Sequence, residues 1–345
     1  MIGGLIMRRV EVNDAVGLPL GHDITEIIAD KKIKRVAFRR GHVICAEDIS
    51  RLLDLGKTAI FVVEEGDTDI HEDDAALTVA PLAAGPNIDF DDEPREGKIN
   101  FRAAVDGVFR VDPERLYRIN RLAIPTMVTI PNNFPVQAGQ LLAGFRIVPL
   151  TCDAAIIDEV VAELSAHLLS VEPYVVKTAA VLVTGSEVYE GRIKDAFLPR
   201  LKATLKPFGV AVTHNCILPD DRQRISNEVR QAMADCDIVF VTGGTSVDPD
   251  DVTVLALEDA GVRFAVRGMP VQPGNNFTIG QFDGTSVCAV PAATIFHRAT
   301  AFDVLLPRLL ARVKISAEDI HRLGHGGLAQ PGAEEHFPDC TFGIG

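Results

Sequence analysis

Two adjacent glycines followed by hydroxyl and carboxylate side chains form the segment of this sequence best suited to chemistry. Ile238 to Val241 is a short apolar run, typical of a strand buried on both faces, and Thr242-Gly243-Gly244-Thr245-Ser246 follows it. Paired glycines let the backbone approach a ligand closely, and neighbouring hydroxyls and amides can hold an anion. Asp248, Asp250 and Asp251 come next, and such carboxylates can hold a Mg²⁺ ion that in turn binds the anion. The loop indicates a site for a phosphorylated or otherwise anionic ligand, but a simple Gly-Gly turn between a strand and a helix explains it equally well.

Three other predicted turns carry polar side chains of the same kind. They are Thr184-Gly185-Ser186-Glu187, Pro219-Asp220-Asp221 and Gln272-Pro273-Gly274-Asn275. Each alone has a plain structural explanation, because Glu187 could cap a helix, Asp220 could be an N-cap residue, and Pro273-Gly274 could be only a turn. Together they favour a binding site, provided that the fold brings them to one place.

The spacing of apolar residues predicts strands that alternate with helices from residue 178 to residue 315. Strands are expected at 179–183, 210–218, 238–241 and 262–266, and a hairpin over 277–290. Helices are expected at 193–206, 222–235, 252–260 and 294–313. This alternation indicates a three-layer, doubly wound α/β domain with a mostly parallel sheet and one antiparallel edge. Ligands of such sheets lie outside the carboxyl ends of the strands, which is where all four turns are expected.

The first half of the chain indicates smaller, β-rich α+β domains. Residues 1–75 contain short apolar segments and a helical pattern at 46–55, which predict a small α/β segment. Residues 76–173 show short strands separated by Gly, Pro and Asn, typical of a small barrel or sandwich, closed by an amphipathic helix over 151–172. We expect a domain boundary at 172–178 and a flexible tail over 316–345. The tail contains three side chains that could bind a metal ion, namely His325, His336 and Cys340. Their spacing matches no standard metal site.

Composition argues against several functional classes. The net charge is −14, from 34 Lys and Arg against 48 Asp and Glu, which disfavours a nucleic-acid partner or an anionic membrane surface. The 6 cysteines show no paired spacing, and no apolar run reaches a membrane-spanning length. No secretory signal is recognisable at the start. We therefore expect a globular, cytoplasmic protein.

The order and spacing of the four turns resemble the molybdopterin-binding domain that molybdopterin adenylyltransferases and molybdopterin molybdotransferases share. The resemblance covers about residues 178–315. It rests on Thr184-Gly-Ser-Glu187, Pro219-Asp-Asp221, Thr242-Gly-Gly-Thr-Ser-Val247 with Asp251, and Pro273-Gly274 before a hairpin. The β-rich first half looks more like the molybdotransferase type, which works as a homodimer.

The resemblance implies roles for these residues. It assigns the phosphate of molybdopterin, or the AMP of adenylyl-molybdopterin, to Gly243, Gly244, Thr245 and Ser246. Further cofactor-binding residues that it implies are Thr184, Gly185, Ser186, Pro273, Gly274 and Asn275. Asp251 and Asp220, with Glu187, would hold Mg²⁺ or the incoming molybdate and carry the reaction, because a cation must separate two anions. In that reaction molybdate enters the dithiolene and AMP leaves. Arg267 is the nearest candidate cation for an oxyanion.

This sequence departs from the family pattern at its cationic positions. The family usually has lysine beside its Pro-Gly turn, which here is Gln272-Pro-Gly-Asn275-Asn276. The family's later Leu-Pro-Gly-Asn-Pro-like loop is here Val290-Pro-Ala-Ala-Thr294, followed by His297 and Arg298. The acidic set favours an enzyme of molybdenum cofactor biosynthesis, a molybdopterin molybdotransferase, whereas the missing lysines favour a non-catalytic molybdopterin carrier, chaperone or sensor. A nucleotide-binding hydrolase on the same domain is a third alternative.

Overall fold

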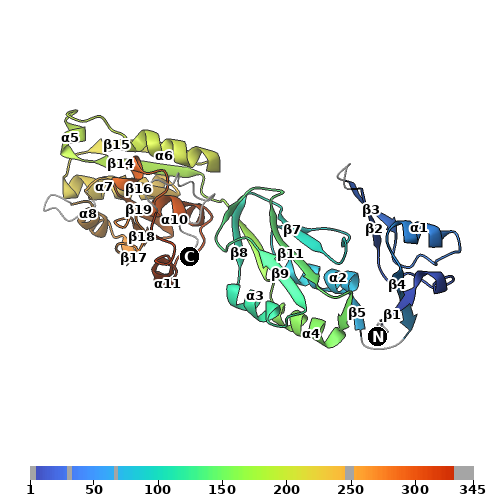
Figure 1. Ribbon diagram of the computed structural model, residues 1–345. Coiled ribbons are helices and arrows are strands. Elements are labelled where there is room, and N and C mark those ends of the chain that lie inside the picture. Colours follow the sequence, from blue (N-terminus) through green and yellow to red (C-terminus); the bar gives the residue numbers. More distant parts are fainter. Residues whose placement is uncertain (1–4, 29–32, 66–68, 245–251, 330–345) are drawn as a thin grey trace. The chain divides into compact units, whose positions relative to one another are not determined.

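The computed structural model describes residues 5–28, 33–65, 69–244 and 252–329 (Figure 1). The chain divides into two compact units. The first contains Met1–Val105, Phe109–Asn132 and Gln137–Val171, and the second contains Asp106–Val108, Asn133–Val136 and Glu172–Gly345. None of the helices in the described ranges combines the length and the apolar character that crossing a bilayer requires.

The first unit begins with two antiparallel strand pairs around a small core. Strand β1 (Leu5–Glu11) pairs with β4 (Ala59–Glu65), and β2 (Ile24–Ile28) pairs with β3 (Ile33–Phe38). A short 3-10 turn, η1 (Val12–Asp14), follows β1. Helix α1 (Asp48–Asp54) contributes the buried Leu52 to this core, and Gly56, with φ +74, follows its end.

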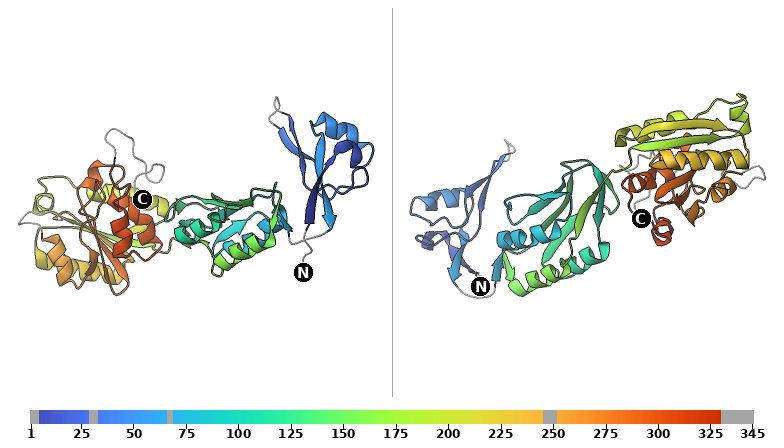
Figure 2. Two further views of the ribbon diagram at one scale, coloured as in Figure 1. Left: turned by 60° about the horizontal axis from the view of Figure 1, so that its bottom comes forward. Right: turned by 180° about the vertical axis from the view of Figure 1, so that it is seen from behind.

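The rest of the first unit contains helices and short strands. In chain order they are β5 (Asp69–His71), α2 (Glu72–Ala83), β6 (Ile88–Phe90), β7 (Ile99–Ala103), β8 (Gly107–Val111), α3 (Pro113–Asn120), β9 (Pro125–Thr129), β10 (Pro135–Val136), β11 (Leu141–Ile147), β12 (Thr151–Asp153), α4 (Ala154–Glu163) and β13 (Leu169–Pro173). The sheets have the orders β6-β7-β11-β9, β10-β8-β13 and β12-β5. Helix α2 packs against β7, β11 and α4 (Figure 2).

The helix expected over 151–172 is wrong in its extent. Asp153 caps α4 by accepting a hydrogen bond from the Ala155 amide at 2.9 Å, so the helix starts at Ala154. It ends at Glu163, and the chain then re-enters a sheet as β13, in which Leu169 and Val171 are buried. These two residues follow the period of 2 that belongs to a strand. The apolar stripe of the helix and the alternation of the strand run into each other in the sequence, which is why one long helix was expected.

The second unit is built on one mixed sheet of order β15-β14-β16-β19-β18-β17. Its elements are β14 (Thr178–Thr184), α5 (Ser186–Tyr189), α6 (Phe197–Leu205), η3 (Lys206–Phe208), β15 (Ala211–Leu218), α7 (Arg222–Asp235), β16 (Ile238–Thr242), α8 (Thr253–Asp259), β17 (Arg263–Val266), β18 (Thr278–Phe282), β19 (Thr285–Val290), α9 (Ala293–Phe296), α10 (Ala301–Leu310) and α11 (Ala317–Arg322). Strands β15, β14, β16 and β19 are parallel, and β18 and β17 are joined to them by antiparallel pairing.

Helices cover both faces of this sheet (Figure 1). On one face, Leu201 of α6 and Phe302 of α10 share a core with Phe240 of β16, and the rings of Phe240 and Phe302 meet edge to face at 5.6 Å. On the other face, Ile225 of α7 and Leu257 of α8 pack against the alternate residues of the same strands. Both faces of β14 and β16 are therefore buried, as their continuous apolar runs predict.

Two sequence-based expectations need correction in this unit. The single helix expected over 294–313 is broken into α9 and α10, because Thr300 and Asp303 form a capping box that starts a new helix at Ala301. The segment expected as a flexible tail is partly packed: Ile320 of α11 is fully buried, and the Gln272 amide donates to the Gly327 carbonyl at 2.7 Å. Residues 316–329 are thus part of the unit.

Candidate functional site

The carboxyl ends of the parallel strands lie level at one edge of the sheet. Thr184 pairs with Leu218, Val183 pairs with Thr242, and Thr242 pairs with Val290. Neighbouring strands are about 4.8 Å apart, so the loops that follow β14, β15 and β16 begin beside one another. This register explains how segments 34 to 69 residues apart can make the direct contacts described next.

The loops after β14 and β15 are joined by a reciprocal pair of hydrogen bonds. The Ser186 amide donates to Asp220 Oδ2 at 2.7 Å, and the Asp220 amide donates to Ser186 Oγ at 3.2 Å. Gly185, with φ +144, provides the backbone bend before Ser186. Among the described residues, Oδ1 of Asp220 has no hydrogen-bond partner.

The Gly-Gly bend after β16 lies directly on the end of β14. Thr184 Oγ1 donates to the Thr242 carbonyl at 2.9 Å and lies 3.1 Å from Thr253 Oγ1. A Cβ atom on Gly243 would lie 2.2 Å from the Thr184 carbonyl oxygen, and one on Gly244 would lie 2.6 Å from Thr253 Oγ1. Both positions have positive φ, +84 and +53. The approach of the two loops therefore requires glycine at both positions.

A buried hydroxyl at the end of β16 has no partner within the described ranges. Thr242 is fully buried, and its Oγ1 has no hydrogen-bond partner in the described part of the chain. Buried polar atoms are nearly always paired with protein or with ordered water, and an orphan needs an explanation. The Thr242 side chain shares the sheet face of Ile238 and Phe240, whereas Thr184 meets Thr253 of α8 on the other face, so the contacts of the Gly-Gly bend do not include this hydroxyl.

Glu187 lies at this edge, on the first turn of α5. Its side chain folds back over the preceding glycine, since a Cβ atom on Gly185 would lie 3.0 Å from Glu187 Oε1. The residue is exposed. The structure thus brings Thr184, Gly185, Ser186, Glu187 and Asp220 into one neighbourhood with Gly243 and Gly244.

The remaining expected ligand residues of the described chain lie farther along the same edge of the sheet, because Thr278 at the start of β18 pairs with Ala289, beside the end of β19. The Pro273 carbonyl accepts from the Ala301 amide at 3.2 Å, and a Cβ atom on Gly274 would lie 2.9 Å from the same nitrogen. The turn that ends in Asn275 is therefore packed on the start of α10. Arg267 forms an ion pair with Glu258 of α8, and its guanidinium carbon lies 5.5 Å from the centre of the Phe264 ring.

Arg267 lies at the same edge as the Gly-Gly bend, but three strand positions along it. It follows β17, which is separated from β16 by β19 and β18. Three strand spacings amount to about 14 Å. Thr245, Ser246 and Asp251, with Asp248 and Asp250, lie outside the described residues, as do His336 and Cys340.

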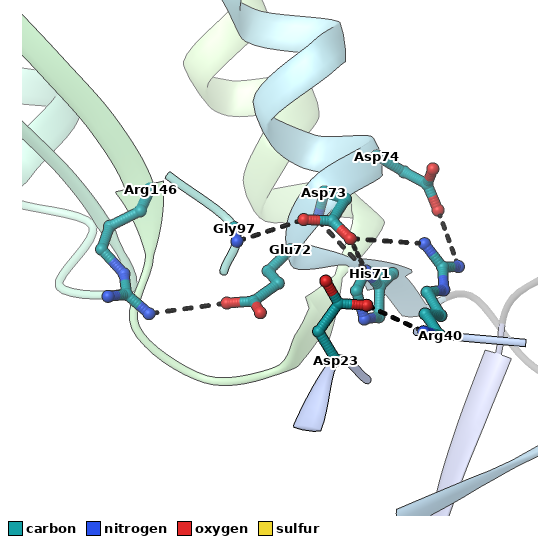
Figure 3. Close-up of polar contacts among 8 residues, drawn as sticks. All are labelled: Asp23, Arg40, His71, Glu72, Asp73, Asp74, Gly97 and Arg146. Atoms are coloured by element: carbon teal, nitrogen blue, oxygen red, sulfur yellow. Dashed lines mark hydrogen bonds and ion pairs between the residues drawn. The ribbon is translucent and has the colours of Figure 1, made fainter. Parts of the chain in front are cut away.

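The first unit holds a second polar cluster, which sequence patterns did not single out (Figure 3). Arg40 Nη2 lies 3.1 Å from Asp74 Oδ2, and the Arg40 amide donates to Asp23 Oδ1 at 2.8 Å. At the first turn of α2, Asp73 Oδ1 accepts from the Gly97 amide at 3.1 Å. These contacts tie four separate segments of the first unit together.

Glu72 and His71 are the buried members of this cluster. Glu72 is 8% exposed and lies 3.5 Å from Arg146, and burial raises its pKa to about 7. His71 is 1% exposed, and burial lowers its pKa to about 4. Glu72 therefore stays protonated and neutral at pH values where an exposed glutamate is ionised. His71 stays unprotonated and neutral at pH values where an exposed histidine is charged. The available sequence signal was the run Glu72-Asp73-Asp74, which suits the start of a helix.

A parallel-stranded α/β sheet with glycine, hydroxyl and carboxylate groups at the carboxyl ends of its strands defines a class of ligand-binding domain. Residues 180–311 match the family described as "Probable molybdopterin binding domain". The match confirms the resemblance found in the sequence. Residues 9–64 match a separate model, described as a domain of unknown function.

Curated relatives share parts of this chain. A molybdopterin molybdenumtransferase of Staphylococcus epidermidis is 29% identical over 114 residues, which cover 31% of this chain and 27% of the relative. A CinA-like protein of Solibacter usitatus is 37% identical over 75 residues, which cover 22% of this chain and 18% of the relative. The matches thus span less than a third of these relatives.

Among other solved structures, a structural comparison matches the chain to a molybdopterin biosynthesis MoeA protein from Pyrococcus horikosii. It is 14% identical and covers 90% of this chain and 76% of its own, with a TM-score of 0.34.

Proposed function

We propose that the second unit binds adenylyl-molybdopterin at the loops after β14, β15 and β16, and that the protein inserts molybdate with release of AMP. The observation that supports this most directly is the reciprocal hydrogen bonding of Ser186 and Asp220 beside the Gly243 bend. It gathers backbone amides, a hydroxyl and a carboxylate within one small region, which is the donor set that a phosphoanhydride and its counterion need.

In this proposal the chain's own residues position the phosphates and supply a fixed negative charge. The glycine backbone at 243–244 lets the phosphate approach closely, and Ser186 and Thr245 offer hydroxyls. Asp220 keeps Ser186 in place through one carboxylate oxygen and presents the other to the ligand. A single carboxylate oxygen fits Mg²⁺, which usually keeps several waters and substrate phosphates as its other ligands. When bound, Mg²⁺ neutralises the phosphoanhydride oxygens, and Asp251 and Glu187 are the further candidates to hold it.

In the first test, the protein is mixed with adenylyl-molybdopterin, molybdate and Mg²⁺, and chromatography measures the AMP that is released. We expect the wild-type protein to release AMP, and Asp251→Asn and Asp220→Asn to lower kcat by about 100-fold or more, because each removes a charge from the site. Asparagine at position 220 keeps an acceptor for the Ser186 amide, so the change tests charge rather than folding.

Asp221→Asn is the matched control for that experiment. Asp221 is the next residue in the chain, but its Oδ1 accepts from the Arg224 amide at 2.9 Å as the N-cap of α7. Asparagine is an equally good N-cap, so turnover should stay within a factor of about two of wild type. Equal losses in Asp220→Asn and Asp221→Asn would contradict a specific role for Asp220.

A non-catalytic molybdopterin carrier is the second candidate. It is favoured by the absence of lysine at the Pro273-Gly274 turn and by the ion pair that Arg267 already makes with Glu258. Tight pterin binding without AMP release, in wild type as in Asp251→Asn, would support this alternative. The resemblance to molybdotransferases also implies a homodimer, which we include in the proposed function. Light scattering of the purified protein measures this oligomeric state.

A further inference from the structure

Three side chains of metal-ligand type meet on the outer strand of the six-stranded sheet, between β15 and α7. His214 and Cys216 are two residues apart on β15 and so point to the same face. A register shift between Ala179 and Ala180 leaves Thr213 without a paired residue on β14. This irregularity turns His214 and Cys216 toward α7, whereas Val212 packs into the core on the opposite face.

Glu228 of α7 completes the group. Its Oε1 lies 2.7 Å from His214 Nε2, and the ligand atoms of His214, Cys216 and Glu228 all lie within 4.8 Å of one another. The side chains of His214 and Glu228 are 26% and 25% exposed, so the group is half-buried but reachable from solvent. In the described ranges this is the only set of three such donors that is close enough to share one ion.

The separations suit a tetrahedral ion. With Zn–N near 2.0 Å and Zn–S near 2.3 Å, neighbouring ligand atoms of a zinc ion lie about 3.3–3.6 Å apart. Side-chain rotations that lengthen the 2.7 Å separation of His214 and Glu228, and bring the sulfur to a similar distance from both, produce that geometry. Imidazole nitrogen, thiolate sulfur and carboxylate oxygen are together typical of zinc and related transition metals, and not of Mg²⁺ or Ca²⁺.

We propose that His214, Cys216 and Glu228 form a binding site for a divalent transition-metal ion of the zinc type, with water or another ligand in the fourth position. The ion clamps the outer strand β15 onto α7, and Cys216 lies four residues before Asp220 in the chain. It therefore also steadies the strand from which the Asp220 loop emerges. The site is distinct from the pterin-binding loops and does not depend on the proposed function.

In the ion-free protein the same residues form an ordinary polar contact. His214 and Glu228 share a hydrogen bond, and burial raises the pKa of the Cys216 thiol to about 12. An incoming ion must therefore displace the thiol proton, as it does at other cysteine sites. A metal titration distinguishes a binding site from a simple His–Glu contact.

The test uses the full chain, reduced and stripped of metal by a chelator, titrated with Co²⁺ and with Zn²⁺. We expect one ion per chain at this site, with a thiolate-to-cobalt charge-transfer band in the near ultraviolet. Cys216→Ser should remove that band and weaken Zn²⁺ binding by about 100-fold or more. Glu228→Gln should keep the band, because the sulfur is still present, but weaken Zn²⁺ binding by about 10-fold or more.

Two other cysteines serve as matched controls. Cys45 also has neighbours of ligand type, since its Sγ lies 3.0 Å from Asp48 Oδ2 and His42 Nε2 lies 2.7 Å from the same oxygen. Cys340 lies in the C-terminal segment near His336. Cys45→Ser and Cys340→Ser should leave the band unchanged.

The proposal is overturned if wild-type protein shows no thiolate band at saturating Co²⁺. It is also overturned if the band survives Cys216→Ser and disappears in Cys45→Ser or Cys340→Ser. Far-ultraviolet circular dichroism checks the folding of each variant. If Cys216→Ser fails to fold, the Zn²⁺ dissociation constant of Glu228→Gln tests the proposal instead. An unchanged dissociation constant in that variant rejects the site.

Discussion

Replacing Gly243 with alanine is expected to lower the free energy of unfolding of the second unit by about 3–5 kcal/mol. The position has φ +84, and the new Cβ atom would lie 2.2 Å from the Thr184 carbonyl oxygen. That oxygen belongs to the backbone of β14 and cannot rotate away as a side chain could. The substitution must therefore push the ends of β14 and β16 apart, in addition to the cost of a left-handed backbone.

Gly284→Ala is the matched control for this prediction. Gly284 has nearly the same backbone angle, φ +86, but no atom lies within 4 Å of its Cβ position. Alanine there costs only the left-handed conformation, about 1–2 kcal/mol. The difference between the two variants isolates the contact between Gly243 and Thr184.

The measurement has to resolve the two units from each other. The chain contains no tryptophan, so unfolding is followed by circular dichroism, and hydrogen exchange of peptides from β14 and β16 reports on the second unit locally. Faster exchange in Gly243→Ala than in Gly284→Ala is the expected result. Similar effects of the two changes would mean that the Gly-Gly bend does not press on β14, and would remove the structural basis of the proposed pterin site.

Part of this site could be predicted from the sequence because parallel strands impose their own geometry. Apolar runs at 179–183 and 238–241, each ended by a Thr-Gly pair, are enough to place the two loops at one sheet edge. The reciprocal contact between Ser186 and Asp220 is a more specific result that only the register of β14 and β15 provides.

The features that the sequence did not reveal depend on contacts between distant segments. Arg267 was proposed as the nearest cation for an oxyanion because it precedes the Pro273 turn by few residues, and its ion pair with Glu258 is a contact that the sequence did not reveal. The His214, Cys216 and Glu228 group was not singled out, since it depends on a strand irregularity at Thr213. Helix α2 was also missed, because the alanine-rich segment with Pro81 near its end has no clear apolar stripe.

Replacing Glu72 with glutamine is expected to remove a pH dependence from the stability of the first unit. The Glu72 carboxylate occupies space beside Gly97, where a Cβ atom would lie 2.2 Å from its Oε2. Burial is the main reason that its pKa rises to about 7, and the neighbouring Asp73 adds to the effect. Arg146, at 3.5 Å, offsets only part of it. The ionised carboxylate is thus the unfavourable form in the folded protein.

The sign follows from proton binding in the two states. In the unfolded chain the Glu72 pKa returns to its ordinary value of 4.5, against about 7 in the folded protein. Between these values the folded state binds more protons, so the free energy of unfolding falls as the pH rises through this window, by about 3 kcal/mol in total. His71 contributes with the opposite sign, because burial lowers its pKa from 6.5 to about 4 and its stabilisation is lost as the pH falls through that range.

Because the two contributions oppose each other between about pH 4.5 and 6.5, the wild-type curve alone hides both of them. The informative quantity is the difference in unfolding free energy between Glu72→Gln and wild type, from urea titrations at several pH values. Subtraction removes the His71 contribution, and the difference should shift by about 3 kcal/mol in favour of the variant between pH 4 and pH 8. A constant difference would show that the carboxyl group ionises in the folded protein as it does in water, and that the space beside Gly97 is open to solvent.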